Sequence, residues 1–219
     1  MKLWLDTANI GEIREINSWG VLAGVTTNPT LAGKEGQPFE QLLKEIATEV
    51  DGPVSGEVVA TDREGMVNEG VQIAAIAPNL VVKCPVTPDG YAAVTALTQR
   101  GIKTNMTLCF SPAQAILAAE AGATYISPFL GRVDDIGNDG MSLLAEIVDI
   151  YRTQGYETKV LAASLRHTQH VVDAAKVGAD VATMPHKVFK ALVKHPLTDV
   201  GLERFLADWN DYQRSLGNS

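Results

Sequence analysis

Short apolar runs alternate along the whole chain with longer segments in which apolar residues recur every three or four positions. The short runs predict strands, and the longer segments predict amphipathic helices. We expect strands at 3–6, 24–27, 56–60, 80–84, 103–109, 125–128, 159–163 and 181–184. We expect helices at 39–50, 63–75, 90–99, 112–121, 141–154, 168–177 and 186–193. Strands that alternate with helices in this way form parallel βαβ units.

A weak internal repeat indicates how many units the chain holds. Residues 118–123 (AAEAGA) resemble residues 174–179 (AAKVGA), and each segment is a helix end followed by glycine and a new strand. Their offset of 56 residues equals two units of about 28, and eight such units account for the length of 219. We therefore predict an α/β protein built as a single (βα)8 barrel. A doubly wound open sheet is disfavoured because no Gly-x-Gly-x-x-Gly motif follows an early strand.

A further helical pattern at 199–213 follows the eighth unit. Its apolar residues recur at helical spacing and form a stripe: Leu202, Phe205, Leu206, Trp209 and Tyr212. The sequence leaves open whether this stripe packs on its own barrel or on a neighbouring subunit. We divide the chain into a barrel domain, 1–197, and a C-terminal helix and tail, 198–219, for which we expect a place in a subunit interface. The Gly- and Asp-rich segment 131–140 is expected to be a mobile loop.

Composition and charge restrict the class of protein. The 18 Lys and Arg residues against 26 Asp and Glu give a net charge of −8, and 46% of the residues are hydrophobic, as in globular proteins. The acidic balance without basic clusters argues against nucleic acid or membrane surfaces as partners. No apolar run approaches the roughly 18 residues of a membrane helix, and Asp6 comes too early for a signal peptide. Cys84 and Cys109 lie in apolar runs as core residues, which fits a reducing cytoplasm.

Polar residues interrupt several strands close to their C-terminal ends, where parallel barrels carry their chemistry. Lys83 stands within the apolar run Val-Val-Lys-Cys-Pro, and Pro85 places it at the rim of the barrel. Burial disfavours the charged form of a lysine, and an uncharged amine is able to attack a carbonyl group. A snorkelling or ion-paired lysine is the alternative.

The other strands offer candidates at the same end. Each alone is most simply a helix cap or a hydrogen-bonded core residue, but their recurrence in successive units indicates a site. They are Asp6, Asn28, Glu57, Asn105, Thr107, Ser127, Phe129 and Ser164.

Two arginines, Arg132 and Arg166, follow strands six and seven. Arginine suits bidentate phosphate binding, and the usual place of phosphate beside the last barrel strands fits Arg166 better. Ion pairing with nearby aspartates is the alternative. The histidines show no zinc-ligand spacing, and segment 134–140 lacks the pattern of a calcium loop, so we expect no metal.

Five segments together resemble the transaldolase family in its short form. They are LDTAN (5–9), GVTTNP (24–29), VVKCP (81–85), TNMTLCFSPAQA (104–115) and ISPFLGR (126–132). The resemblance implies transfer of a dihydroxyacetone unit from sedoheptulose 7-phosphate or fructose 6-phosphate to glyceraldehyde 3-phosphate or erythrose 4-phosphate in the pentose phosphate pathway, without a cofactor. It also implies a ring-forming homo-oligomer, a pentamer or decamer, with the C-terminal helix laid across the adjacent subunit.

The resemblance implies a role for each candidate residue. Lys83 resembles the lysine that forms a Schiff base with the ketose, and Asp6 resembles the acid/base of bond cleavage. Glu57 and Thr107 resemble the pair that holds a catalytic water. Asn28, Asn105 and Ser127 resemble the hydroxyl binders, and Arg132, Ser164 and Arg166 resemble the phosphate site.

Two alternative functions stay open. The related fructose-6-phosphate aldolases, which release free dihydroxyacetone, typically carry Gln and Tyr where this chain has Glu57 and Phe129, so the chain looks like the transferase. A barrel that binds a sugar phosphate without catalysis is the second alternative, disfavoured because Lys83 in an apolar strand has little purpose for binding alone.

Overall fold

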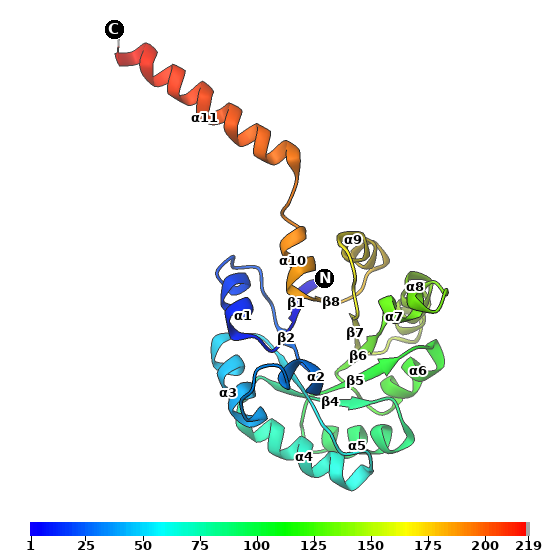
Figure 1. Ribbon diagram of the computed structural model, residues 1–219. Coiled ribbons are helices and arrows are strands. Elements are labelled where there is room, and N and C mark those ends of the chain that lie inside the picture. The colour runs from blue at the N-terminus through cyan, green and yellow to red at the C-terminus, as the bar shows by residue number, and fades with distance from the viewer. Residues whose placement is uncertain (218–219) are drawn as a thin grey trace.

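Eight parallel strands close into a barrel, and their order around the barrel is their order along the chain (Figure 1). The computed structural model describes residues 1–217. The strands are β1 (Lys2–Asp6), β2 (Val25–Thr26), β3 (Val54–Glu57), β4 (Leu80–Pro85), β5 (Thr104–Cys109), β6 (Tyr125–Pro128), β7 (Lys159–Ala162) and β8 (Val181–Met184). Pairing of β1 with β8 closes the barrel. The predicted (βα)8 barrel is confirmed, and the open sheet is excluded.

The helices lie around the outside of the barrel, except for the last one (Figure 1). They are α1 (Ile10–Asn17), α2 (Pro29–Ala32), α3 (Phe39–Glu49), α4 (Arg63–Ile76), α5 (Pro88–Thr98), α6 (Pro112–Glu120), α7 (Leu130–Asp135), α8 (Gly140–Gln154), α9 (Thr168–Val177), α10 (His186–Ala191) and α11 (Pro196–Gly217). Thr87 and Ser111 cap α5 and α6 through side-chain oxygens, each followed by proline at the first helical position. Gly122 and Gly178, the repeated glycines, both adopt left-handed backbone after a helix, which explains the repeat.

Strand register brings alternate side chains into the barrel interior. Asp6 pairs with Thr26, and Lys83 pairs with both Glu57 and Asn105, so these polar residues share the inner face near the C-terminal ends of the strands. A separate buried cluster lies two positions earlier on several strands and forms an apolar floor beneath them. Its members include Trp4, Val81, Tyr125, Leu161 and Val181. The larger core lies between the barrel and the helices.

Two predicted segments need correction. The strand predicted at 56–60 is β3, which ends at Glu57, because the N–H groups of Val59 and Ala60 donate to the carboxylate of Glu69 instead of to a neighbouring strand. Half of the predicted loop 131–140 is the helix α7. Leu130 is buried, and the Gly131 N–H donates to the carbonyl of Ser164 at 3.0 Å, so tertiary contacts hold a helix in a glycine-rich segment.

The C-terminal helix α11 points away from the barrel (Figure 1). It begins at Pro196, two residues before the predicted segment 198–219. Residues 218 and 219 of that segment lie outside the described residues. The apolar stripe is solvent-exposed, with Phe205 at 72% and Trp209 at 58%. The stripe therefore does not pack on its own barrel. Within residues 1–217, no helix combines the length and apolar character needed to cross a membrane.

Candidate active site

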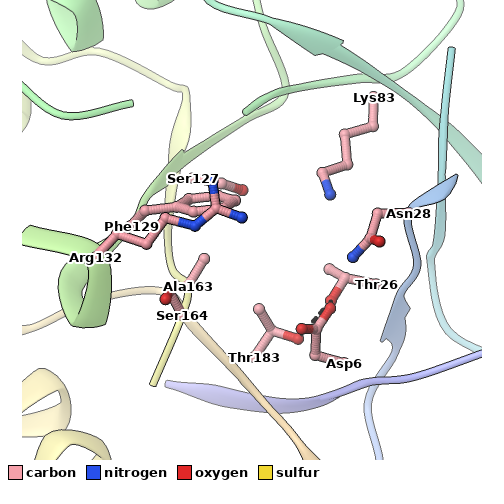
Figure 2. A pocket seen from close by; sticks show the side chains of 10 residues that line it. All are labelled: Asp6, Thr26, Asn28, Lys83, Ser127, Phe129, Arg132, Ala163, Ser164 and Thr183. Atoms are coloured by element: carbon pink, nitrogen blue, oxygen red, sulfur yellow. Dashed lines mark hydrogen bonds between the residues drawn. The ribbon is translucent and has the colours of Figure 1, made fainter. Parts of the chain in front are cut away.

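A cavity of about 110 Å³ lies at the C-terminal ends of the strands (Figure 2). The amine of Lys83 and the guanidinium of Arg132 both point toward its centre. The lining residues are Asp6, Thr26, Asn28, Lys83, Ser127, Phe129, Arg132, Ala163, Ser164 and Thr183. Seven of the eleven predicted site residues are in this set; Glu57, Asn105, Thr107 and Arg166 are not.

Lys83 is held among polar partners. Its side chain is 6% exposed, and its Nζ atom lies 2.9 Å from Oε2 of Glu57 and donates to the carbonyl of Thr27 at 3.3 Å. The apolar neighbours Val82 and Cys84 face the helices, because side chains alternate along a strand. The amine of Lys83 therefore lies among polar groups, although the strand that carries it is apolar. The ion-paired lysine weighed as the alternative is therefore present, and the Glu57 carboxylate is close enough to exchange a proton with the Lys83 amine.

Asp6 lies at the end of β1 on the opposite side of the cavity from Arg132 (Figure 2). Its Oδ1 atom accepts a hydrogen bond from the hydroxyl of Thr26 at 2.7 Å. Burial raises the pKa of Asp6 above its ordinary value, while the charge of Lys83 and the Thr26 hydrogen bond act in the opposite direction. A carboxyl group with a raised pKa is suited to exchanging protons with a substrate near neutral pH.

Asn105 connects two buried hydroxyl groups behind the cavity. Its Oδ1 atom accepts from Ser127 at 2.7 Å, and its Nδ2 atom donates to Ser55 at 3.1 Å. This network fixes the orientation of the amide. Asn28 accepts from the Leu31 N–H at 3.0 Å and so caps α2 while it lines the cavity. The same residue serves as both a helix cap and a wall of the site.

Thr107 carries a buried hydroxyl without a hydrogen-bond partner in the described part of the chain. It precedes Leu108, whose φ of 62° is in the left-handed region, where β5 shifts register against β6. Such a backbone conformation is strained for leucine and is often found at functional sites. A buried hydroxyl of this kind is free to bind a water molecule or a ligand.

The two arginines occupy different environments. Arg132 lies over the ring of Phe129, 4.9 Å from its centroid, and lines the cavity. Arg166 instead donates to the carboxylate of Asp135 at 2.6 Å, and both side chains are more than half exposed. The ion pair weighed as an alternative is therefore formed by Arg166. Arg132, whose place in the sequence fits a phosphate site less well, is the one at the cavity wall.

Three residues of the cavity wall are not among those predicted from the sequence: Thr26, Ala163 and Thr183. Threonine is common in strands, so only the alternation of inward and outward positions along β2 and β8 could have pointed to Thr26 and Thr183.

Burial raises the pKa of the Cys84 and Cys109 thiols to about 12, which keeps both protonated near neutral pH, and both lie in the core as predicted. Residues 1–217 contain no group of three or more potential metal-binding side chains of His, Cys, Asp and Glu.

Fold and site together define a (βα)8 barrel with a lysine-centred polar cavity at the C-terminal ends of its strands. The family model described as Transaldolase/Fructose-6-phosphate aldolase matches residues 3–216. The chain therefore belongs to this family. A protein of Petrotoga mobilis named a probable transaldolase is 58% identical over 99% of this chain and 98% of its own length. One of Clostridium acetobutylicum with the same name is 55% identical over 96% of this chain and 98% of its own.

Solved structures of lower identity share the fold alone. Thiamine phosphate pyrophosphorylase from Pyrococcus furiosus is 15% identical with a TM-score of 0.61, over 87% of this chain and 93% of that one. The N-acetylmannosamine-6-phosphate 2-epimerase from Clostridium perfringens is 14% identical with a TM-score of 0.60, over 94% of this chain and 92% of that one.

Proposed function

We propose that this chain is a transaldolase that transfers a dihydroxyacetone unit through a Schiff base on Lys83. The donors are sedoheptulose 7-phosphate or fructose 6-phosphate, the acceptors are glyceraldehyde 3-phosphate or erythrose 4-phosphate, and the reaction belongs to the pentose phosphate pathway. One observation carries the proposal: a buried lysine, 2.9 Å from Glu57, shares a cavity with Asp6, whose pKa is raised by burial. The names of the similar proteins agree with it.

The proposed reaction begins when the Lys83 amine gives a proton to Glu57 and adds to the ketone carbon of the donor. Loss of water from this adduct leaves an iminium ion, which withdraws electrons from the neighbouring carbon. Asp6 then accepts the proton of the hydroxyl one carbon beyond, the carbon–carbon bond breaks, and its electron pair moves to the iminium nitrogen as an enamine. The aldose phosphate leaves. The enamine adds to an acceptor aldehyde by the reverse steps.

The remaining candidates support these steps in the proposal. Glu57 and Thr107 hold the water that is released and later hydrolyses the imine, in agreement with the buried, unpartnered Thr107 hydroxyl among the described residues. Asn28, Asn105 and Ser127 bind the hydroxyl groups of the attached unit. Arg132, Ser164 and Arg166 bind the phosphate, and Arg166 must exchange its contact with Asp135 for the substrate.

Acceptor dependence separates the proposal from the aldolase alternative. Phe129 contributes no hydroxyl group to the cavity, and Arg132 covers its ring, so the site has no phenol to direct water onto the intermediate. We expect fructose 6-phosphate alone to give no sustained turnover, and addition of erythrose 4-phosphate to start it. Steady release of free dihydroxyacetone without an acceptor would identify an aldolase instead.

Borohydride trapping tests the covalent step and separates an enzyme from a sugar-phosphate-binding barrel. Reduction in the presence of fructose 6-phosphate is expected to add a three-carbon unit to the peptide that contains Lys83. Lys159, a surface lysine at the start of β7, serves as an internal control that should stay unmodified. An unmodified Lys83 peptide in an active sample would contradict the mechanism.

We also infer that the chain acts in the cytoplasm and forms a homo-oligomer, a pentamer or decamer, through α11. The exposed apolar stripe on a helix that points away from its own barrel supports the homo-oligomer. Monomeric soluble proteins rarely expose contiguous apolar patches larger than a few hundred Å².

A further inference from the structure

A chain of hydroxyl groups leads from β8 to the carboxylate of Asp6. The Oγ1 atoms of Thr183 and Thr26 lie 2.7 Å apart, and the Thr26 hydroxyl is also 2.7 Å from Oδ1 of Asp6. Both threonines are buried, and both line the cavity (Figure 2). The three side chains come from the neighbouring strands β8, β2 and β1.

The direction of donation follows from the chemistry of the groups. An ionised carboxylate only accepts hydrogen bonds, so the single proton of the Thr26 hydroxyl is directed to Asp6. The contact between the two threonines is then a hydrogen bond only if Thr183 donates to the oxygen of Thr26. Hydrogen bonds arranged in such a series polarise and strengthen one another. Thr183 thus strengthens the bond between Thr26 and Asp6, although among the described residues its own hydrogen bond is to Thr26.

We propose that Thr183 is a positioning residue for Asp6 in the transferase reaction: its hydroxyl orients Thr26 and thereby stabilises the ionised carboxylate that accepts the substrate proton. The reaction itself rests on the function proposed above, whereas the hydroxyl chain rests on the contacts alone. When Asp6 takes up a proton, the direction of both hydrogen bonds reverses, so that Asp6 donates to Thr26 and Thr26 donates to Thr183. Both protonation states of Asp6 therefore keep a partner.

Other charged groups face Asp6, and the variants must leave them in place. Lys83 on β4 and Arg132 on α7 favour its ionised form, and Glu57 on β3 opposes it. None of these groups contacts Thr183 through a hydrogen bond or ion pair found in residues 1–217. A change confined to the Thr183 hydroxyl therefore isolates the effect of the hydroxyl chain.

Thr183→Val tests the proposal, with Thr183→Ser as the variant that keeps the hydroxyl. Thr104→Val is a matched control, because Thr104 is also a buried strand threonine and its hydroxyl has no partner in the described chain. In Thr183→Val we expect the acidic limb of the kcat–pH profile to move up by about half a pH unit, because the carboxylate loses stabilisation. We expect kcat near that limb to fall about threefold and KM to stay within about twofold. Thr183→Ser and Thr104→Val should keep the wild-type profile.

A titration of the Asp6 carboxyl carbon by 13C NMR gives a second measurement that needs no turnover. Its midpoint should rise in Thr183→Val and stay unchanged in the serine variant and the control. An unchanged midpoint in Thr183→Val, or an equal shift in Thr183→Ser, would overturn the proposal. If borohydride traps no adduct on Lys83 in the wild-type protein, the proposed function is wrong, and the titration still decides whether Thr183 stabilises the Asp6 carboxylate.

Discussion

Individual residues in and beside the cavity are matched to one another in charge and hydrogen bonding, so the loss of one leaves another without its partner. The contact between Lys83 and Glu57 is the clearest case, since both side chains are largely buried. A lone buried charge costs several kcal/mol, whereas removal of both charges is often nearly neutral. The proposed function therefore needs both charges, whereas stability requires only that neither charge is left without the other.

Lys83→Met is expected to abolish transfer and to lower the free energy of unfolding by about 3 kcal/mol, because Glu57 keeps a carboxylate without a cation. The double variant Lys83→Met/Glu57→Gln should recover most of that stability but no activity. Urea denaturation and a coupled transfer assay measure the two effects. Equal stability of the single and double variants would show that the pair is not coupled.

Asp6→Asn is expected to raise the melting temperature while it removes activity. Burial raises the pKa of Asp6, so its ionised form weakens the folded state, and this cost grows as the pH rises through the raised pKa. Asparagine carries no charge at any pH. We expect a Tm gain of a few degrees at pH 7, since about 1 kcal/mol corresponds to about 2–4 °C in a chain of this size.

The gain from Asp6→Asn should shrink as the pH falls toward 3.8, the ordinary value for this group, because wild-type Asp6 is then protonated too. Asp139→Asn is the control with the opposite sign. Hydrogen bonds from Ser142 lower the pKa of Asp139, so its charge favours the folded state near neutral pH. Scanning calorimetry from pH 4.5 to pH 7 measures both. A Tm gain in Asp139→Asn as large as in Asp6→Asn would contradict the assignment of the effect to burial.

Sequence patterns identified the charged, amide and serine residues of the cavity but not its two threonines. Lys83 and Asp6 are conspicuous within apolar strands, whereas Thr26 and Thr183 look like ordinary strand residues. Their importance depends on the 2.7 Å contacts that barrel closure creates between β8, β1 and β2. The ion pair of Arg166 was foreseen only as an alternative, because no local pattern tells whether an arginine meets Asp135 or a cavity.

Among the elements, α7 departs most from the prediction because its helix depends on contacts outside itself. Propensity in a segment rich in glycine and aspartate favours a loop. The helix is nevertheless fixed to the loop after β7 by the Gly131 N–H and by the ion pair of Asp135 with Arg166. It is also fixed to α9 by Asp134, whose carboxylate is 3.1 Å from His170. The eight strands were easier to predict, because buried parallel strands are visible as short apolar runs.

Gly131→Ala should disturb this attachment of α7. A Cβ atom on Gly131 would collide with the carbonyl of Ser164 and with the side chain of Arg166, so the helix must move away from the β7 end. We expect a loss of about 1–3 kcal/mol in stability, typical of overpacking. KM for fructose 6-phosphate should rise about tenfold, while unphosphorylated dihydroxyacetone as donor is affected less.

Gly201→Ala on α11 is the control for this substitution, because no atom lies near the added Cβ and alanine favours helix. Its stability and kinetics should match the wild type or improve slightly. Denaturation and steady-state kinetics with both donors give the comparison. A proportional loss for both donors in Gly131→Ala would place phosphate binding away from the junction of α7 and β7.

For the whole molecule, the cavity of the candidate active site and the exposed helix α11 are separate parts of the chain. The cavity lining comes entirely from residues 6–183 of one chain, and α11 begins at Pro196. The walls of the cavity belong to the barrel, whereas the stripe on α11 lies exposed on a helix that points away from it. Assembly and catalysis should accordingly respond to different substitutions.

Trp209→Glu is expected to dissociate the oligomer while each chain keeps its activity. The substitution puts a charge in the middle of the apolar stripe, and burial of an unpaired charge in an interface is strongly unfavourable. Ala207→Glu is the matched control: it adds the same charge to the same helix, two residues away and therefore on the opposite face. Light scattering coupled to size-exclusion chromatography should give a monomer mass for Trp209→Glu and the wild-type mass for Ala207→Glu. A monomeric wild type, or dissociation by both variants alike, would mean that the stripe on α11 is not the contact between subunits.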